Sequence, residues 1–587
     1  MTKRLKTFFY LSLGLSLLFT IRLTYLQVIA GPRYHRFSNF QSIRRQYLKA
    51  PRGRIFDRRG RIVADVKPSF SLSIIPREVD SIALRELQHL LPIDFNSISG
   101  NNSWTPVEII SNLPKEKVLT IEERLISRRG ISLDVKPLRY YPYPILSHPL
   151  GFLNKITREE LERDTTYRID DFLGKQGIEK EYEKCLKGKD GMRLVEVDAR
   201  GREIGNLPEV KEIRPIAGCD LYLSLDLDLF LLCESLFANY KKGCCIALNP
   251  NDGRVVLLYS KPHFDPNLFL FPLLKEKWEV VKNNPLKPFF NRATQAQFPP
   301  GSTFKPLVAL AGMKKGVLDK NRRFQPCAGS YKFGNRYFRC WTSHGSLNLV
   351  DAIAQSCNTY FYQAGLATGL EAIVQMAQEF PFGKKTGIDL PEESGGNLPT
   401  PEYLQKKFSG KYPKGIVLNL SIGQGEILVT PLQLVLFYCA IARSGEIYQP
   451  HLVDSIKFPS RIYHPPFLDS LPNFRPVPNG NDTTYIYYPQ KRQISLPQEY
   501  LRVIEDGLYF GVERGTGQAA FIPEITICGK TGTAQNPAGP DHAWFCGYGP
   551  KGNPTLVVLV LIENVGAGGT YAAPIAQRIF RRYFNLD

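Results

Sequence analysis

The longest run of hydrophobic residues lies near the start of the chain. The segment "TFFYLSLGLSLLFTIRLTYLQVIA" follows Lys3, Arg4 and Lys6, and it is about long enough to cross a bilayer as one helix. Arg22 interrupts the run, and its long side chain can reach the membrane interface. Since no small-residue cleavage site follows, we expect an uncleaved anchor over residues 7–29. Residues 1–6 are then a cytoplasmic tail.

The flanking charges do not decide the orientation of this anchor in the membrane, because cations lie on both sides of the apolar run. The positive-inside rule is therefore ambiguous here, but long domains translocate largely regardless of charge. We expect the rest of the chain to lie on the extracytoplasmic side of the cytoplasmic membrane, held by a single span.

Alternating patterns beyond the anchor predict strands that change to helices. "RGRIFDRRGRIVAD", residues 52–65, indicates strand, turn and strand, with Asp57 and Gly60 in the turn. "CDLYLSLDLDLFLLCESLF" alternates as a strand and then takes helical spacing. "KKGCCIALNPNDGRVVLLYS" reads as two apolar strands around a turn. We therefore expect a mixed domain over 30–238 and a second domain over 239–587.

The second domain has a strand hairpin, a helical middle and closing strands. Helical spacing dominates residues 302–376, and strands return over 525–565. This order predicts an α+β fold with an antiparallel sheet flanked by helices, rather than a βαβ array.

Composition adds size and charge to this picture. With 587 residues, 43% of them hydrophobic, the chain can form more than one packed domain. The balance of 75 Lys and Arg against 55 Asp and Glu gives a net charge of +20, which favours an anionic partner. The basic stretch 33–61 is interpreted as a stem at the lipid surface rather than a nucleic-acid site, because the anchor already supplies an anionic neighbour.

The cysteines fall into two groups. Eight show no spacing typical of a disulfide ladder and are interpreted as small buried hydrophobes: Cys185, Cys219, Cys233, Cys244, Cys245, Cys439, Cys528 and Cys546. The other three form a C-x12-C-x3-H-x12-C set, Cys327, Cys340, His344 and Cys357, which suits a structural zinc ion. The alternative is buried or disulfide-paired cysteines with a turn histidine.

Ser302 and Lys305 form the only Ser-x-x-Lys spacing in the chain, within "PPGSTFKP". One interpretation is that Ser302 caps a helix beginning at Thr303 while Lys305 is solvated. The other is a nucleophile beside backbone N–H groups, with a lysine on the same helix face that can contact its hydroxyl. The two interpretations are compatible.

A serine acyltransferase of this kind also needs Ser-x-Asn and Lys-Thr-Gly. For Ser-x-Asn we choose Ser356 and Asn358, on a break between two helical runs, over Ser346 and Asn348, which resemble a helix cap.

For Lys-Thr-Gly we choose Lys530, Thr531 and Gly532 over the loop residues 385–387. The chosen motif follows a predicted strand, and a strand edge can pair with an extended peptide.

With these motifs the chain resembles class B penicillin-binding proteins, and within that class the elongation type, penicillin-binding protein 2. The matching stretches run in the family's order from the anchor onwards: "RGRIFDRRG", "GKQGIEKEYEKCLKG", "NRATQAQFPPGSTFKP", "SCNTYFYQAG", "TGIDLPEE", "LSIGQGEILVTPLQL", "GKTGTAQ" and "DHAWFCGYGP". The resemblance implies a pedestal or dimerisation-type domain before a transpeptidase domain, and no glycosyltransferase domain.

The resemblance also implies the chemistry. Ser302 would attack the penultimate D-Ala carbonyl of a peptidoglycan stem peptide, or a β-lactam, with Lys305 as base. Ser356 would relay a proton, and Asn358 would hold the peptide. The remaining roles fall on the Lys-Thr-Gly strand: Lys530 and Thr531 would engage the terminal carboxylate, and the N–H groups of Ser302 and Thr533 would form an oxyanion hole.

No cofactor is required for this chemistry, and the zinc ion would order the wall of the site. The resemblance implies a glycan polymerase of the SEDS family as partner, together with membrane lipids and no nucleic acid.

Three alternatives use the same motifs. A β-lactam hydrolase or sensor is one, and Glu393 and Asn397 could then be read as a deacylating pair, although a polar loop is the simpler interpretation. A septal transpeptidase and a catalytically idle scaffold of wall synthesis are the others.

Overall fold

A computed structural model describes residues 2–31, 43–91, 107–125, 128, 130–168, 171–197, 203–206, 212–270, 275–458, 471–479 and 482–586. The chain forms two compact units that interleave along the sequence. Unit 1 comprises Met1–Arg52, Lys67–Leu138 and Gly188–Ala217, and unit 2 comprises Gly53–Val66, Arg139–Lys187 and Gly218–Asp587.

Unit 1 begins with the apolar helix predicted from the sequence. Helix α1 (Thr2–Thr24) continues into the π-helical turn η1 (Tyr25–Ile29). The span Lys3–Ile29 is long and apolar enough to cross a membrane. Its side chains are almost all exposed to solvent in the absence of a bilayer.

The rest of unit 1 contains strands of two sheets. Strands β1 (Ile43–Leu48), β8 (Gly191–Val197) and β9 (Glu203–Asn206) form one antiparallel sheet. In the other, β3 (Ile62–Ile74) pairs with β4 (Val107–Ile110) and β5 (Ile131–Tyr140), and it carries the helices α3 (Ser81–Leu90) and α4 (Lys115–Leu125).

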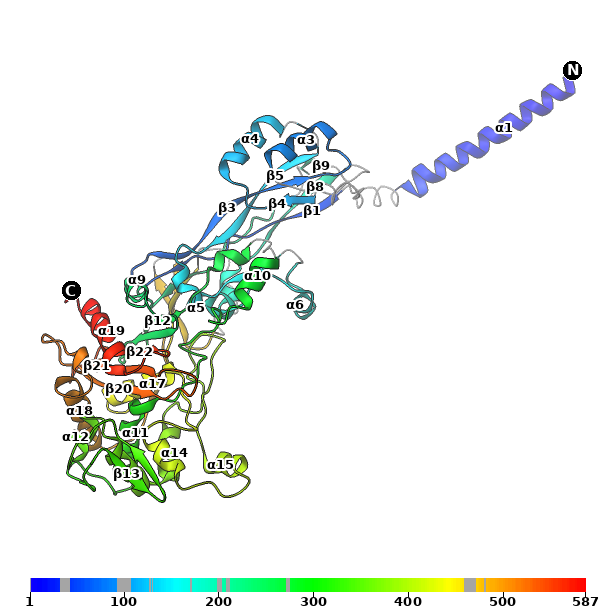
Figure 1. The fold of residues 1–587 in the computed structure, drawn as a ribbon. Helices are drawn as coiled ribbons and strands as arrows, with labels where there is room; N and C mark the ends of the chain where they lie inside the picture. Colours follow the sequence, from blue (N-terminus) through cyan, green and yellow to red (C-terminus); the bar gives the residue numbers. More distant parts are fainter. Residues whose placement is uncertain are drawn as a thin grey trace. The chain divides into compact units, whose positions relative to one another are not determined.

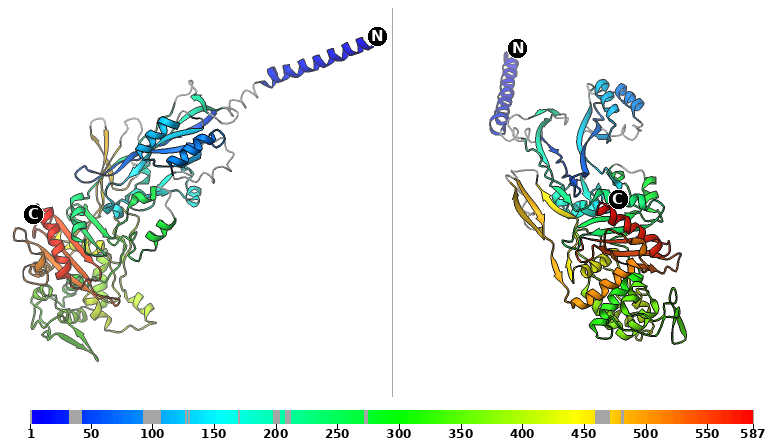
Figure 2. Two further views of the ribbon diagram at one scale, coloured as in Figure 1. Left: turned by 45° about the horizontal axis from the view of Figure 1, so that its top comes forward. Right: turned by 90° about the vertical axis from the view of Figure 1, so that its left-hand side faces the viewer.

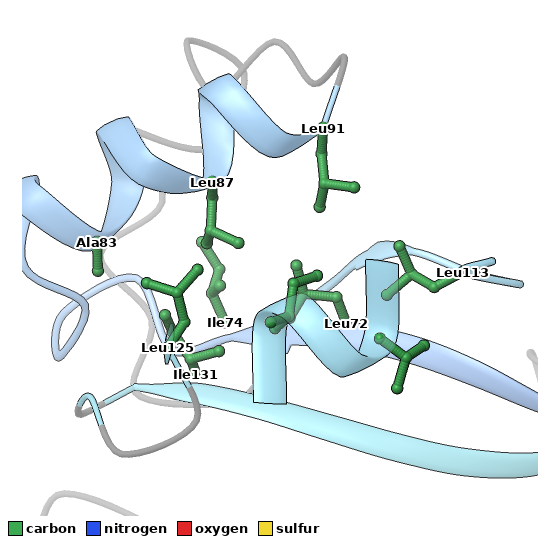
Figure 3. Packing of buried hydrophobic residues seen from close by; sticks show 10 residues of the cluster. Leu72, Ile74, Ala83, Leu87, Leu91, Leu113, Leu125 and Ile131 are labelled. Atoms are coloured by element: carbon green, nitrogen blue, oxygen red, sulfur yellow. The ribbon is translucent and has the colours of Figure 1, made fainter. Parts of the chain in front are cut away.

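The two helices bury one face each against these strands. Asp80 caps α3 by accepting a hydrogen bond from the Ala83 N–H, and Ala83 and Leu87 lie four residues apart on the buried face. Figure 3 shows these side chains packed with Leu72 and Leu125 in a shared apolar core. The spacing of the buried positions therefore determines which face of each helix meets the sheet.

Unit 2 is built on a five-stranded antiparallel sheet with the order β12-β11-β22-β21-β20. Its strands are β11 (Gly243–Leu248), β12 (Val255–Lys261), β20 (Cys528–Ala534), β21 (His542–Gly549) and β22 (Leu556–Ile562). Nearly every residue of these strands is buried, as expected for a sheet covered on both faces. The predicted α+β fold with an antiparallel sheet flanked by helices is confirmed.

Helices cover both faces of this sheet (Figures 1 and 2). Helix α19 (Gly568–Tyr583) packs on β20, β21 and β22 and contacts α9 (Leu227–Leu236). The apolar helix α17 (Pro431–Ala442) packs against β11, β21 and β22. Helix α18 (Gln498–Glu513) contacts the edge strand β20.

The helical middle of the domain begins with α11 (Lys305–Lys314). After it come α12 (Leu349–Ala354), α13 (Asn358–Thr368), α14 (Leu370–Glu379), α15 (Pro401–Lys407) and α16 (Ile416–Ser421). A hairpin that the sequence analysis did not predict, β13 (Ser330–Phe333) and β14 (Arg336–Arg339), lies between α11 and α12. The aromatic residues on both sides of the Gly334-Asn335 turn are the signal that could have revealed it.

The predicted strand and helix segments at the start of unit 2 are also confirmed. Asp57 and Gly60 form the turn between β2 (Ile55–Phe56) and β3, and the Gly60 N–H donates to the Asp57 carbonyl at 3.0 Å. Strand β10 (Asp220–Leu223) precedes α9. The eight cysteines interpreted as small hydrophobes are all buried and unbridged.

Candidate active site

Ser302 lies in a short 3-10 turn, η5 (Gly301–Phe304), that runs directly into α11. The turn starts one residue before Ser302, at Gly301, whose φ of 56° suits a glycine. Ser302 is therefore inside the turn, and its side chain caps neither helix. The prediction that Ser302 caps a helix beginning at Thr303 is wrong. Ser302 is partly exposed between the buried residues Gly301 and Thr303, so it stays open to a reactant.

Lys305 is completely buried, so the interpretation of a solvated lysine is also wrong. Its Nζ donates to the Ser356 carbonyl and to Asn358 Oδ1, both at 2.7 Å, and lies 3.3 Å from Ser356 Oγ. In the described part of the chain no hydrogen bond joins Lys305 to the Ser302 hydroxyl. The expected contact is absent because the Lys305 amine donates its hydrogen bonds to oxygens of the Ser-x-Asn motif instead.

Ser356 occupies the break between α12 and α13, as predicted. Its φ of 55° lies in the left-handed region, which a non-glycine residue adopts at some cost. Cys357 then caps α13, its Sγ accepting from the Tyr360 N–H at 3.4 Å. The competing motif is a cap, since Asn348 accepts from the Asp351 N–H at the start of α12.

Lys530, Thr531, Gly532 and Thr533 lie on β20, which is an edge strand of the sheet. This edge lies directly against the Ser302 turn: a Cβ on Gly532 would be 3.0 Å from the Pro300 carbonyl oxygen. Likewise, a Cβ on Gly301 would lie 3.3 Å from the Thr533 nitrogen. The fold thus places the third motif beside the first.

The rejected Lys-Thr-Gly, residues 385–387, is part of a loop. The Thr386 and Gly387 N–H groups both donate to the Glu393 carboxylate, at 2.6 and 3.1 Å. Asn397 Nδ2 donates to the Glu426 carbonyl at 2.6 Å. Glu393 and Asn397 are therefore engaged in holding this loop, which supports the polar-loop interpretation over a deacylating pair.

The electrostatics of the site are dominated by two buried amines. Burial lowers the pKa of Lys305 to about 8, against the opposing influence of Cys340 and Cys357. Burial lowers the pKa of Lys530 well below its usual value, and the charge of Lys305 lowers it further. Within the described ranges neither amine has a carboxylate partner. A carboxylate partner is therefore left for a ligand to supply.

Two residues that sequence reasoning missed support the third motif. Thr516 Oγ1 lies 2.5 Å from Thr531 Oγ1. Gln424 Nε2 donates to the Thr533 carbonyl at 3.1 Å, and the Gly301 N–H donates to the carbonyl of the neighbouring Gly423 at 2.9 Å. Gln424 lies in one of the matching stretches, "LSIGQGEILVTPLQL", whereas nothing in the sequence around Thr516 signals its position.

The predicted Cys/His set is brought together in space. The ligand atoms of Cys327, Cys340, His344 and Cys357 all lie within 4.8 Å of one another. His344 Nδ1 lies 3.6 Å from Cys327 Sγ and 3.5 Å from Cys340 Sγ. All three cysteines are unbridged, so the disulfide alternative is not what the structure has.

Models of two families match the chain. The penicillin-binding protein transpeptidase domain matches residues 243–581, and the penicillin-binding protein dimerisation domain matches residues 47–223. The first covers the five-stranded sheet and all three motifs. The second corresponds to the pedestal-type domain expected from the sequence.

Curated relatives are similar over nearly the whole chain. The peptidoglycan D,D-transpeptidase MrdA of Haemophilus influenzae is 32% identical, over 95% of this chain and 88% of the relative. The protein of the same name from Escherichia coli K12 is 30% identical, over 96% of this chain and 91% of the relative.

Solved structures show the same similarity. The penicillin-binding protein PBP2 of Helicobacter pylori, in complex with MreC, has a TM-score of 0.78 and 26% identity, covering 92% of this chain and all of that one. A chain of a peptidoglycan synthase complex has a TM-score of 0.74 and 29% identity, covering 99% and 98%. The chain belongs to the penicillin-binding protein transpeptidase family, and within its class B to the elongation-type penicillin-binding protein 2 group.

Proposed function

We propose that this chain is a serine D,D-transpeptidase that crosslinks peptidoglycan stem peptides during cell-wall elongation and is acylated by β-lactams. The observation that carries the proposal is the pair of buried amines, Lys305 and Lys530, beside Ser302 without a carboxylate partner in the described residues. A substrate that ends in a carboxylate supplies such a partner. Both a D-Ala-D-Ala stem peptide and a penicillin have this group.

Ser302 is the nucleophile in this proposal, and Lys305 is its base. In the first step a bond forms between Ser302 Oγ and the penultimate D-Ala carbonyl carbon, and the amide bond to the terminal D-Ala breaks. The hydroxyl proton passes to Lys305 Nζ, which is partly neutral near pH 8. A neutral Lys305 keeps two N–H groups for its 2.7 Å acceptors, the Ser356 carbonyl and Asn358 Oδ1.

Ser356 is proposed to return that proton to the leaving amine. Once Lys305 has taken the Ser302 proton, a third N–H is available to Ser356 Oγ, which lies 3.3 Å from Nζ. Ser356 can therefore pass a proton between Lys305 and the departing D-Ala nitrogen. Asn358 has a further role, which is to hold the peptide.

The Lys-Thr-Gly strand is proposed to bind the substrate. Lys530 and Thr531 engage the terminal carboxylate, Gly532 allows the close approach of β20 to the Ser302 turn, and the backbone of the strand edge pairs with the extended stem peptide. The N–H groups of Ser302 and Thr533 face the developing oxyanion. Their closeness is supported by the 3.3 Å between a Cβ on Gly301 and the Thr533 nitrogen.

Covalent labelling by a fluorescent penicillin tests this function. We expect one stable label per chain on wild-type protein and none on Ser302→Ala. Rapid turnover of a chromogenic β-lactam would favour a hydrolase, and absence of labelling on folded wild-type protein would favour an idle scaffold. The bonds of Glu393 to the 385–387 loop support the transpeptidase over the hydrolase.

We propose that the same chain is a single-pass protein of the inner membrane, with its catalytic domain outside the cytoplasm. The span Lys3–Ile29 supports the anchor, and membrane lipids are its neighbours. One related structure is a complex with MreC, and another coordinates polymerization and crosslinking in a synthase complex. The second of these supports a glycan polymerase as partner, which we propose to be of the SEDS family. The limits 1–6, 7–29, 30–238 and 239–587 are kept as the proposed domain division.

A structural zinc ion at Cys327, Cys340, His344 and Cys357 is also proposed, although the transpeptidase chemistry needs no cofactor. In a tetrahedral site with Zn–S about 2.3 Å and Zn–N about 2.0–2.1 Å, a sulfur and a nitrogen lie roughly 3.6 Å apart. His344 Nδ1 lies 3.5 and 3.6 Å from the Cys340 and Cys327 sulfurs. The residues present therefore fit the ion.

The thiolate chemistry of the set agrees with this fit. A hydrogen bond from the Cys357 thiol, the Asn358 and Thr359 N–H groups and the charge of Lys305 lower the pKa of Cys340. The ion would join Cys327, ahead of the β13–β14 hairpin, and Cys340, just after it, to Cys357 inside the Ser-x-Asn motif. It would thereby order this wall of the site.

A further inference from the structure

The segment between Asp319 and Asp351 has an unusual charge pattern. It contains no acidic residue and six basic ones, all exposed: Lys320, Arg322, Arg323, Lys332, Arg336 and Arg339. Among the residues that the structure describes, none of the six lies within ion-pair distance of a carboxylate. Asp351, at the end of the segment, pairs with Arg514 instead. The segment therefore presents uncompensated positive charge to the solvent.

The same segment exposes large aromatic side chains. Tyr337 on β14 is 67% exposed and Trp341, just beyond it, is 60% exposed. The hairpin itself is well anchored, because Tyr331 stacks on Tyr362 of α13 and Phe338 packs edge-on against the same ring. Exposed aromatics on an anchored hairpin offer flat surfaces that do not need to be ordered on binding.

The hairpin and Trp341, which follows it, form hydrogen bonds with residues on both sides of Ser356. On one side Trp341 Nε1 donates to the Gln355 carbonyl at 3.1 Å. On the other, Asn358 Nδ2 donates to the Arg339 carbonyl at 3.3 Å, and Tyr362 donates to the same carbonyl at 3.1 Å. The basic and aromatic surface is thus continuous with the Ser-x-Asn wall of the active site. Figure 1 shows the hairpin, labelled β13, projecting from the helical part of unit 2.

We propose that the β13–β14 hairpin and Trp341 bind the acceptor strand, the second peptidoglycan strand whose amine takes the acyl group. This inference rests on the proposed transpeptidase function. A stem peptide carries carboxylates, which Arg336 and Arg339 attract, and its glycan carries sugar rings, which stack on Tyr337 and Trp341. The donor peptide is assigned to β20, so the Ser-x-Asn side is left for the acceptor.

The reaction that this surface serves is the second half of crosslinking. The acceptor amine forms a bond to the acyl carbon, the bond from that carbon to Ser302 Oγ breaks, and one amine proton returns through Lys305 to the serine oxygen. A bound acceptor strand places its amine at the acyl carbon. This gives the amine a high effective concentration there, so that it competes with water for the acyl group.

Charge reversal of Arg336 and Arg339 tests the proposal. Both side chains are exposed, and the Arg339 contact to Asn358 uses the main-chain carbonyl, which R336E/R339E retains. The matched control is K406E/K411E, which makes the same charge change at exposed lysines in and just after α15. Each full-length protein is assayed for penicillin acylation, for release of the acyl group by hydroxylamine, and for crosslinking of glycan strands.

We expect R336E/R339E to crosslink at least about fivefold more slowly than the control, since each exposed charge contact contributes little alone. Acylation by penicillin and release by hydroxylamine should match the control, because neither uses the acceptor strand. Equal crosslinking by the two double variants overturns the proposal. So does a variant that loses only its binding to anionic vesicles, since the surface would then face lipid.

A milder pair keeps the test decisive if R336E/R339E fails to fold or to acylate. R336Q/R339Q removes the positive charge without adding negative charge, and it is scored against K406Q/K411Q in the same assays. Failure of wild-type protein to acylate or to crosslink counts against the proposed function itself. Active wild type with unaffected hairpin variants counts against the acceptor surface alone.

Discussion

Lys305 Nζ lies 2.7 Å from Asn358 Oδ1, although 53 residues separate the two in the chain. The contact joins the first residue of α11 to the first residue of α13, and it is sealed from solvent at Lys305, which is 0% exposed. Because Ser302 lies three residues before Lys305, this single contact fixes the Ser-x-x-Lys turn against the Ser-x-Asn motif. The site is therefore assembled before any substrate arrives.

The acylation rate should rise with pH and level off above about pH 8. Burial lowers the pKa of Lys305 to about 8, so the amine is protonated below this pH and cannot accept the Ser302 proton. Below the pKa, the second-order rate of penicillin acylation should rise about tenfold per pH unit. The measurement is that rate between pH 5.5 and 9. A flat profile, or one that falls with pH, would show that Lys305 is not the base.

Lys530→Met should weaken acylation without unfolding the protein. Met fills a similar volume and lacks the amine whose burial is unfavourable, so the free energy of unfolding should not fall. Loss of the carboxylate partner should lower the efficiency of acylation by penicillin by about 10²–10³. Lys385→Met, in the rejected loop motif, is the control and should acylate normally. Similar acylation by the two variants would remove Lys530 from the site.

Thr516→Val should impair the site through Thr531. The substitution is close to isosteric and removes the hydroxyl that lies 2.5 Å from Thr531 Oγ1. We expect acylation efficiency to fall by about 5- to 10-fold, as for one lost hydrogen bond. Thr516→Ser keeps the hydroxyl and should restore most of the rate. Equal acylation efficiencies of the Thr516→Ser and Thr516→Val variants would show that this contact does not position Thr531.

Ser356→Gly and Ser356→Ala should separate backbone strain from proton relay. Both remove the hydroxyl, so both should acylate about 10²- to 10⁴-fold more slowly. Only Gly accepts the φ of 55° freely, so the Gly variant should be about 0.4–1 kcal/mol more stable than the Ala variant in urea unfolding. Near wild-type acylation by the Gly variant would show that Ser356 contributes backbone geometry alone.

Purified protein should contain about one zinc ion per chain by elemental analysis. Cys327→Ser should lose the ion and unfold at lower temperature, because it removes one ligand of the set. Cys439→Ser, at a buried cysteine outside the set, should keep the ion even if it is less stable. Zinc-free wild-type protein with freely reactive thiols at Cys327 and Cys340 would contradict the proposal.

Sequence patterns predicted the architecture well in segments whose apolar residues follow a single helical or strand period. The apolar run before Ala30, the β11–β12 hairpin and the closing strands β21 and β22 all follow from spacing alone. The break between α12 and α13 at Ser356 was also predicted, because it is visible in the pattern of apolar residues.

The details around Ser302 depend on long-range contacts that no local pattern contains. The sequence around Lys305 is typical of a solvated first helical turn, yet Ser356 and Asn358 bury it. Thr516 approaches Thr531 only because α18 packs on β20. The β13–β14 hairpin was missed because the helical pattern on either side of it was extended across it.

The central claim is that Ser302 forms the acyl-enzyme, and intact-protein mass spectrometry after treatment with penicillin tests it most directly. The claim predicts a mass increase of one penicillin per chain, a modified peptide that maps to Ser302, and no increase for Ser302→Ala of unchanged thermal stability. A stable adduct on Ser302→Ala, or one that maps to another residue of the wild-type chain, would contradict it.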